Sequence, residues 1–152
     1  DIENDTRHQN FSNTMERLIE LGVIPIINEN DTVATEEIVI GDNDTLSAFV
    51  AVSVGADILV LLSDIDGLFT ADPHKDPTAT LIERVDRIDD YILSLGGGRG
   101  SALGTGGMAT KLRAAEIATE GGCDMIIANG NTPTNLYDIL DGKSVGTTFT
   151  GA

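Results

Sequence analysis

The sequence has little sulfur, few aromatic rings and no long apolar run. Cys123 is the only cysteine among the 152 residues, so no internal disulfide can form and we expect a cytoplasmic protein. Aromatic residues make up 4% of the chain and tryptophan is absent, which leaves little surface for stacking nucleic-acid bases. No apolar run reaches the roughly 18 residues of a transmembrane helix, and no signal peptide is recognisable, so we expect no membrane partner.

Basic residues are also scarce. Lysine and arginine number 9 against 25 aspartates and glutamates, which gives a net charge of −16. This balance argues against binding a polyanion through a basic surface, so we expect no nucleic-acid partner. No lysine or arginine lies between Leu18 and His74, a stretch rich in carboxylates. These carboxylates either serve solubility alone, or some of them bind a cation such as Mg²⁺ or a substrate ammonium group.

Apolar and polar segments alternate as in a single α/β domain or a part of one, and 41% of the residues are hydrophobic. Short apolar runs predict buried strands at residues 23–27, 57–62 and 125–128, and an edge strand at residues 145–149. Helical spacing predicts helices at residues 11–22, 88–95, 107–120 and 136–140. This order predicts a parallel or mixed sheet between layers of helices.

A glycine-rich loop enters one of these helices, at Gly104-Thr105-Gly106-Gly107-Met108-Ala109-Thr110-Lys111. Glycines let backbone N–H groups approach an anion, and a helix N-terminus adds partial positive charge. The loop is not a Walker A motif, because Thr110 precedes Lys111 rather than following it. Taken alone, the stretch is equally compatible with a phosphate-binding loop and with a turn that caps a surface helix.

Polar residues also lie where predicted strands end or helices begin. Residues 28–31 (Asn-Glu-Asn-Asp) follow the strand predicted at 23–27, at a position where open α/β sheets bind ligands. Residues 41–44 (Gly-Asp-Asn-Asp) precede a helix predicted to place Leu46, Phe49, Val50 and Ser53 on one face. One of its aspartates is expected to cap the helix. The same polar residues would also suit ordinary turns.

Three of these motifs together resemble the amino acid kinase family, in its branch that phosphorylates glutamate. They are the segment from Ile27 to Asp31, the segment from Gly41 to Ala48, and the glycine-rich loop. The segment from Ser63 to Pro73 is shared more widely in the family and supports the fold rather than the substrate. The resemblance implies a three-layer αβα sandwich around a mainly parallel sheet.

The resemblance also implies an activity. The expected reaction is ATP-dependent phosphorylation of the γ-carboxylate of L-glutamate to glutamyl 5-phosphate, the opening step of proline biosynthesis, with Mg²⁺ on the nucleotide phosphates. The expected assembly is a homo-oligomer, and relatives are often inhibited by proline. Two alternatives stay open: another kinase of the family, acting on aspartate, acetylglutamate or uridylate, and a nucleotide-binding module without catalysis.

Residue roles are carried over by matching positions. Lys111 would neutralise charge on the transferring phosphoryl group, while Asp44, with help from Asp42, would hold catalytic lysines in place. The positions that match glutamate-binding residues or share their loop are Asn28, Asp31 and Asn43. The positions that match nucleotide-binding segments are Ser63, Asp64, Thr105, Gly106, Gly107, Met108, Ala109, Thr110 and Lys111.

The sequence departs from the family pattern at its start. Family members begin with a strand and a glycine-rich segment that carries a second catalytic lysine, and neither is present here. We therefore expect residues 1–152 to be one domain, the C-terminal part of the kinase domain, with little or no activity alone. Ser63 stands where a threonine is usual, which preserves the hydroxyl.

Overall fold

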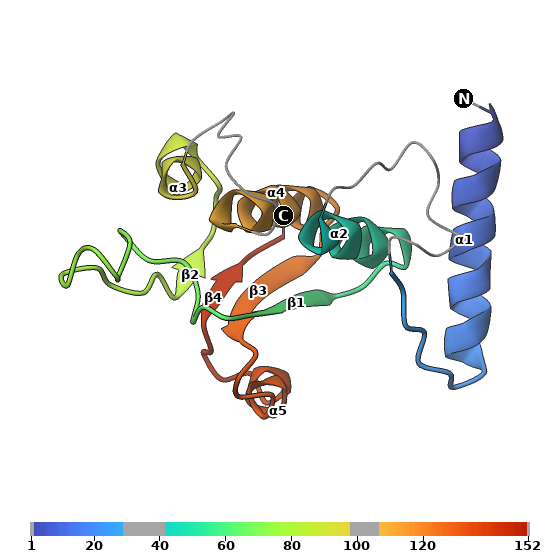
Figure 1. Ribbon diagram of the computed structural model, residues 1–152. Coiled ribbons are helices and arrows are strands. Elements are labelled where there is room, and N and C mark those ends of the chain that lie inside the picture. Colours follow the sequence, from blue (N-terminus) through green and yellow to red (C-terminus); the bar gives the residue numbers. More distant parts are fainter. Residues whose placement is uncertain (1, 29–41, 98–106, 152) are drawn as a thin grey trace.

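The computed structural model describes residues 2–28, 42–97 and 107–151 of the chain. Figure 1 shows the elements in these residues. The helices are α1 (Ile2–Glu20), α2 (Asn43–Ser53), α3 (Asp90–Leu95), α4 (Met108–Glu120) and α5 (Asn135–Leu140). The strands are β1 (Ile58–Ser63), β2 (Arg84–Val85), β3 (Asp124–Asn129) and β4 (Thr147–Phe149).

The strands form one mixed sheet in the order β1-β3-β4-β2. β1 and β3 are parallel, with Ile58 opposite Asp124, whereas β4 runs antiparallel to β3 and parallel to β2. The prediction of an edge strand at residues 145–149 is wrong, because β2 lies outside β4 and the Phe149 side chain is fully buried. β2 is too short, at two residues, to produce a recognisable sequence pattern.

The helices cover both faces of the sheet, as the three-layer prediction requires. Helices α2 and α4 lie on one face and α5 lies on the other (Figure 1). Along β3, Met125 and Ile127 belong to the core cluster beneath α2 and α4, while Ile126 and Ala128 pack with the α5 side. This alternation follows from the two-residue period of a strand. The α/β class and the layered arrangement are therefore confirmed.

Small residues allow α2 and α4 to pack closely together. The interior of this layer includes alanines from both helices: Ala48, Ala51, Ala114, Ala115 and Ala118. The predicted buried face of α2 was partly wrong, since Phe49 is 38% exposed, whereas Thr45, Ala48 and Ala51 are buried. Leu46 is buried as predicted, and the other buried positions of α2 carry small side chains, so bulk alone did not decide the buried face.

Two N-terminal predictions need correction. Residues 23–27 form no strand, and the side chains of Ile24 and Ile26 are 87% and 93% exposed. An apolar run becomes a strand only beside a hydrogen-bonding neighbour, and none lies next to this segment within the described residues. The helix predicted at residues 11–22 is α1, which begins earlier, at Ile2.

The burial predicted for β1 is also incomplete. This strand lies at the sheet edge, and only its Leu61 is buried.

α1 is the longest helix of the described residues, and it stands apart from the sheet (Figure 1). Met15 is buried, and the hydroxyl of Ser12 donates to the carbonyl of Ser53 at the end of α2, 3.3 Å away. The rest of its described surface is mostly polar. Neither α1 nor any other helix in the described parts of the chain is both long enough and apolar enough to cross a bilayer.

Candidate active site

The connections of the fold bring the N-termini of α2 and α4 to one edge of the sheet. α2 ends shortly before β1, and α4 ends at the turn Gly121-Gly122, shortly before β3. Because each helix runs back along the sheet before its strand begins, both helix N-termini lie towards the carboxyl ends of β1 and β3. Ligands of open α/β sheets bind at such an edge.

Asp42 starts α2 by capping it. Its Oδ1 accepts a hydrogen bond from the Thr45 backbone N–H at 2.7 Å, and its Oδ2 accepts from the Thr45 hydroxyl at 3.0 Å. A capping carboxylate satisfies a helix N–H that has no intrahelical partner. The predicted cap is therefore Asp42, and Asp44 follows it in the first turn. Any help that Asp42 gives to a lysine is indirect, because it fixes the turn that carries Asp44.

The start of α4 differs from that of α2. Its N-cap is Gly107, and no side chain of the described residues makes a capping hydrogen bond there. The first N–H groups of a helix have no intrahelical acceptor, and the helix dipole favours an anion beside them. The hydroxyl of Thr110 lies 2.7 Å from the Gly107 carbonyl oxygen. This helix start has the chemistry of a phosphate site.

Lys111 and Asp44 form a buried ion pair that joins the two helices. The Nζ atom of Lys111 lies 3.0 Å from Oδ2 of Asp44, and the side chains are 8% and 17% exposed. Removing two charges from water costs several kcal/mol per ion, which close pairing only partly offsets. Apolar side chains of similar size would fill this space at lower cost. A buried ion pair at a ligand-binding edge is therefore a candidate for function.

A second polar group lies at the carboxyl ends of β1 and β3. The Ser63 hydroxyl donates to Asp64 at 3.1 Å, and the Asn129 amide donates to Asp66 at 2.7 Å. The backbone N–H of Asn131 donates in turn to Asn129 Oδ1 at 2.9 Å. Sequence reasoning missed Asn129, although the rule that singled out Asn28, a polar residue directly after a predicted strand, would have found it.

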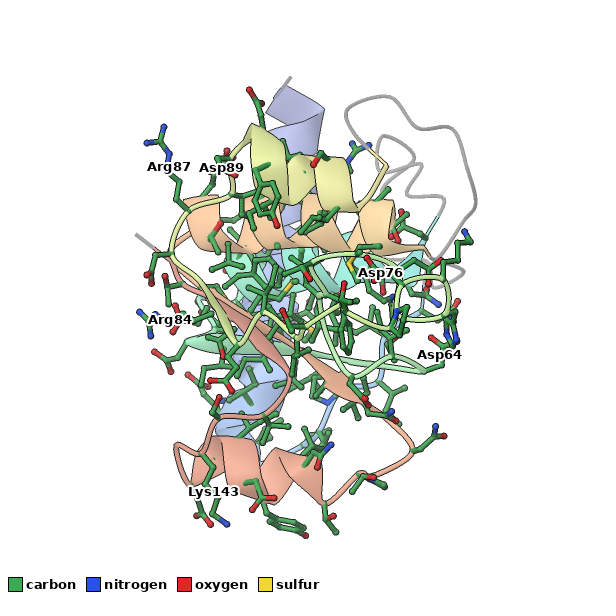
Figure 2. The ribbon with its side chains drawn as sticks, turned by 90° about the vertical axis from the view of Figure 1, so that its left-hand side faces the viewer. Asp64, Asp76, Arg84, Arg87, Asp89 and Lys143 are labelled. Atoms are coloured by element: carbon green, nitrogen blue, oxygen red, sulfur yellow. The ribbon has the colours of Figure 1, made fainter. Side chains whose placement is uncertain are left out.

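The labelled side chains of Figure 2 place this group within the molecule. Asp64 lies on one side of the molecule, and Arg84 and Arg87 lie on the opposite side. Asp64 is exposed, and its neighbour Ser63 is half-buried. The carboxylate of Asp64 is therefore accessible from solvent next to the end of β1.

The remaining predicted residues are only partly described. Asn43 is exposed in the first turn of α2, and Asn28 is exposed in the extended segment after α1. Asp31, Thr105 and Gly106 lie outside the described residues. Met108 and Ala109 are half-buried in the first turn of α4. The structure thus brings Asp44, Thr110 and Lys111 together, while the predicted glutamate site is not assembled within the described residues.

Within residues 2–28, 42–97 and 107–151, no group of three or more histidine, cysteine, aspartate or glutamate side chains could hold a metal ion. Asp44 already pairs with Lys111, and Asp42 already caps α2. Mg²⁺ is commonly held by substrate phosphates together with one or two carboxylates, so a group of three protein ligands is not required for it.

Comparison with known proteins gives the family. The model of the amino acid kinase family matches residues 1–129. The chain belongs to the amino acid kinase family. Its sequence relatives include the glutamate 5-kinases of Clostridium tetani and Deinococcus radiodurans, each 53% identical over 149 residues, or 98% of this chain. Those 149 residues cover 56% and 41% of the two relatives, so the chain spans about half the length of the curated relatives it matches.

Solved structures of amino acid kinases have a similar fold. A carbamate kinase from Giardia lamblia bound to AMP-PNP gives a TM-score of 0.55 at 27% identity, covering 73% of this chain and 32% of that chain. A uridylate kinase from Archaeoglobus fulgidus gives a TM-score of 0.53 at 25% identity, covering 70% of this chain and 46% of that chain. These likenesses agree with the mixed sheet between helices described above.

Proposed function

We propose that this chain provides the nucleotide site, and part of the acceptor site, of an enzyme that transfers a phosphoryl group from ATP to the γ-carboxylate of L-glutamate. The product would be glutamyl 5-phosphate, which makes the reaction the opening step of proline biosynthesis. One observation carries the proposal: a buried lysine, paired with an aspartate, lies near the start of a helix whose N-cap is a glycine, in a chain 53% identical to glutamate 5-kinases.

Lys111 is suited to stabilise the charge of the transferring phosphoryl group. Its ammonium group has three N–H donors, and Asp44 accepts one of them at 3.0 Å. Phosphoryl transfer needs alignment and positive charge more than it needs covalent chemistry from the protein. A lysine fixed in a largely buried place supplies that charge without reorganisation at the moment of transfer.

The residues at the start of α4 fit a nucleotide phosphate, and those at the end of β1 fit the rest of the nucleotide. Gly107 brings no side chain that would block an anion from the first N–H groups of α4. Ser63 and Asp64 offer a hydroxyl and an exposed carboxylate for hydrogen bonds. ATP with Mg²⁺ is the proposed donor, since Mg²⁺ would lower the charge of the phosphates that approach this acidic chain.

Asn28, Asp31 and Asn43 are the proposed glutamate-binding residues. A carboxylate can pair with the substrate ammonium group, and amides can bind the substrate carboxylates without repelling them. Exposure of Asn28 and Asn43 is compatible with this role. Asn43→Ala should raise the KM for glutamate more than the KM for ATP. Initial-rate kinetics would measure both constants.

A chimaera tests the proposed function. In it, this chain replaces the matching 149-residue segment of the Clostridium tetani relative. With ATP and hydroxylamine, we expect glutamate to give the hydroxamate, whereas aspartate and acetylglutamate give none and uridylate stimulates no ADP release. The matched control is the same chimaera with Lys111→Met, which should lose turnover; circular dichroism checks its folding, because the change leaves Asp44 without its partner. A folded chimaera that binds ATP and shows no glutamate-dependent ADP release would contradict the proposal.

Several expectations from the family remain proposals with tests of their own. We propose that the protein self-associates, which sedimentation velocity would measure, and that proline inhibits it in competition with glutamate. We also propose a cytoplasmic location, which cell fractionation would test. The 152-residue chain alone should form little hydroxamate, and robust formation by that chain would overturn this expectation.

A further inference from the structure

The hydroxyl of Thr110 contacts the ion pair of Lys111 and Asp44 directly. Oγ1 of Thr110 lies 2.8 Å from Oδ2 of Asp44, and Nζ of Lys111 lies 3.0 Å from the same oxygen. The hydroxyl also lies 2.7 Å from the carbonyl oxygen of Gly107. One side chain thus joins the first turn of α4 to a carboxylate 66 positions away in the sequence.

The proton of this hydroxyl has two acceptors. A threonine hydroxyl carries a single proton, and a carboxylate and a carbonyl are both acceptors. The Gly107 carbonyl also accepts the backbone N–H of Lys111, at 3.4 Å. One proton therefore serves two acceptors, the Gly107 carbonyl at 2.7 Å and Asp44 at 2.8 Å, and a hydrogen bond to a charged carboxylate is in general the stronger kind.

We infer that Thr110 is a positioning residue, whose hydroxyl holds Asp44 and thereby the ammonium group of Lys111 where phosphoryl transfer needs it. This inference rests on the proposed function for its effect on rate, while its geometric part stands on the contacts above. Threonine in a helix has two common χ1 rotamers, and the hydrogen bond of the Thr110 hydroxyl to the Gly107 carbonyl favours one of them. Lys111 has a long flexible stem, and the fixed oxygen of Asp44 limits where its Nζ can lie.

This role differs from direct contact with nucleotide. Within the described residues the Thr110 hydroxyl has two acceptors, both from the protein, so its proton is already used before ATP arrives. Removing the hydroxyl should therefore disturb the placement of Lys111 rather than remove a phosphate contact. The expected signature is a loss of kcat with little change in the KM for ATP.

The test compares Thr110→Val with Thr119→Val in the chimaera described above. Thr119 lies on the same helix, and its hydroxyl donates to the Ala115 carbonyl at 2.7 Å without contacting an ion pair. We expect Thr110→Val to lower kcat by about tenfold to a hundredfold, since it removes a hydrogen bond to a charged group. Thr110→Ser should recover most of the rate, and Thr119→Val should keep it. If Thr110→Val does not fold, Thr110→Ala replaces it.

A spectroscopic measurement reports on Lys111 without turnover. The sequence contains Lys75, Lys111 and Lys143, and the side chains of Lys75 and Lys143 are 85% and 62% exposed. In ¹⁵N-lysine-labelled protein the Nζ signal of buried Lys111, assigned by its loss in Lys111→Arg, should show slowly exchanging protons. Thr110→Val should shift this signal and speed its exchange, and Thr119→Val should leave it unchanged.

The outcomes separate this inference from the proposed function. An unchanged Nζ signal and an unchanged kcat in Thr110→Val would overturn the inference. A raised KM for ATP with unchanged kcat would also overturn it, because the hydroxyl would then bind the nucleotide. If the unmodified chimaera shows no glutamate-dependent turnover, the proposed function fails, and the Nζ signal alone then decides whether Thr110 positions Lys111.

Discussion

The ion pair of Lys111 with Asp44 and that of Arg84 with Asp86 differ in burial far more than in length. The first measures 3.0 Å with side chains 8% and 17% exposed, and the second measures 2.6 Å with side chains 63% and 73% exposed. Water solvates both partners of the exposed pair and screens their attraction. The longer pair is therefore the one on which the protein depends, because breaking it leaves a charge without water or a partner.

The two pairs also differ in their connections. Arg84 and Asp86 lie two residues apart, so their contact is local, whereas Lys111 and Asp44 tie the start of α4 to the start of α2. The hydrogen bond from Thr110 adds to the second connection. A local exposed pair can form and break with little effect on the stability of the fold. The contact within a buried pair that joins two elements depends on how those elements pack.

The largest expected effect follows from removing Asp44. Asp44→Ala leaves the ammonium group of Lys111 buried without its partner, so we expect a loss of about 3–5 kcal/mol in the free energy of unfolding. Urea denaturation measures it. The control is Asp138→Ala, which breaks the exposed pair with Lys143 and should cost less than about 1 kcal/mol. The double variant Asp44→Ala with Lys111→Met should recover most of the loss. Equal losses in Asp44→Ala and Asp138→Ala would contradict the comparison between the buried and the exposed pair.

A smaller effect is expected at the cap that precedes Asp44. Asp42→Ala removes the hydrogen bonds to Thr45 and should cost about 1 kcal/mol. Asp89→Ala is the matched control, since Asp89 caps α3 through the N–H of Ile92 at 3.0 Å and should cost a similar amount. Only Asp42→Ala should shift the Nζ signal of Lys111. A shift in both variants would mean that the cap of α2 has no special connection to the ion pair.

The next effect is the salt dependence of the coupling within each of the two ion pairs. Double-mutant cycles measure the coupling between partners, here Lys111 with Asp44 and Arg84 with Asp86. Between low salt and 1 M salt, at which the Debye length falls to about 3 Å, coupling in the exposed pair should fall below detection. Coupling in the buried pair should change little. Equal losses of coupling would show that water reaches Lys111.

The smallest effect is the pH dependence at Asp86. The hydrogen bond from the Arg84 side chain lowers the pKa of Asp86 below its usual 3.8. A lowered folded-state pKa stabilises the fold above the unfolded value, and this contribution is lost as pH falls through the folded value. Asp86→Asn should therefore slightly lower the thermal midpoint at pH 6 and leave it unchanged near pH 2. A difference that grows on acidification would contradict this sign.

Much of the fold around the site follows from local sequence signals. The apolar runs that became β1 and β3 and the glycines that end α4 were sufficient to place these elements along the chain. Residues 23–27 carried the same kind of signal without becoming a strand. Their side chains have no neighbouring strand within the described residues, and composition cannot supply one.

The candidate site was predictable in its residue types and less so in its contacts. The sequence motifs indicated Asp44, Thr110 and Lys111, but the sharing of one Asp44 oxygen by the other two depends on the distance between α2 and α4. That distance is a property of packing between segments far apart in the sequence. Asn129 and Asp66 form a pair for the same reason, through the register of β3 beside β1.

The buried alanines of α2 and α4 help to set the distance between the two charged groups of the site. A methyl group is the smallest side chain that can still pack, so this contact keeps the two helices close together, and with them Asp44 and Lys111. Ala48 and Ala115 are buried and carry no charge. A larger side chain at either position would spread the helices and lengthen the contact between Nζ and Oδ2. An apolar layer with no chemistry of its own thus acts as the spacer that sets how far apart the two charged groups lie.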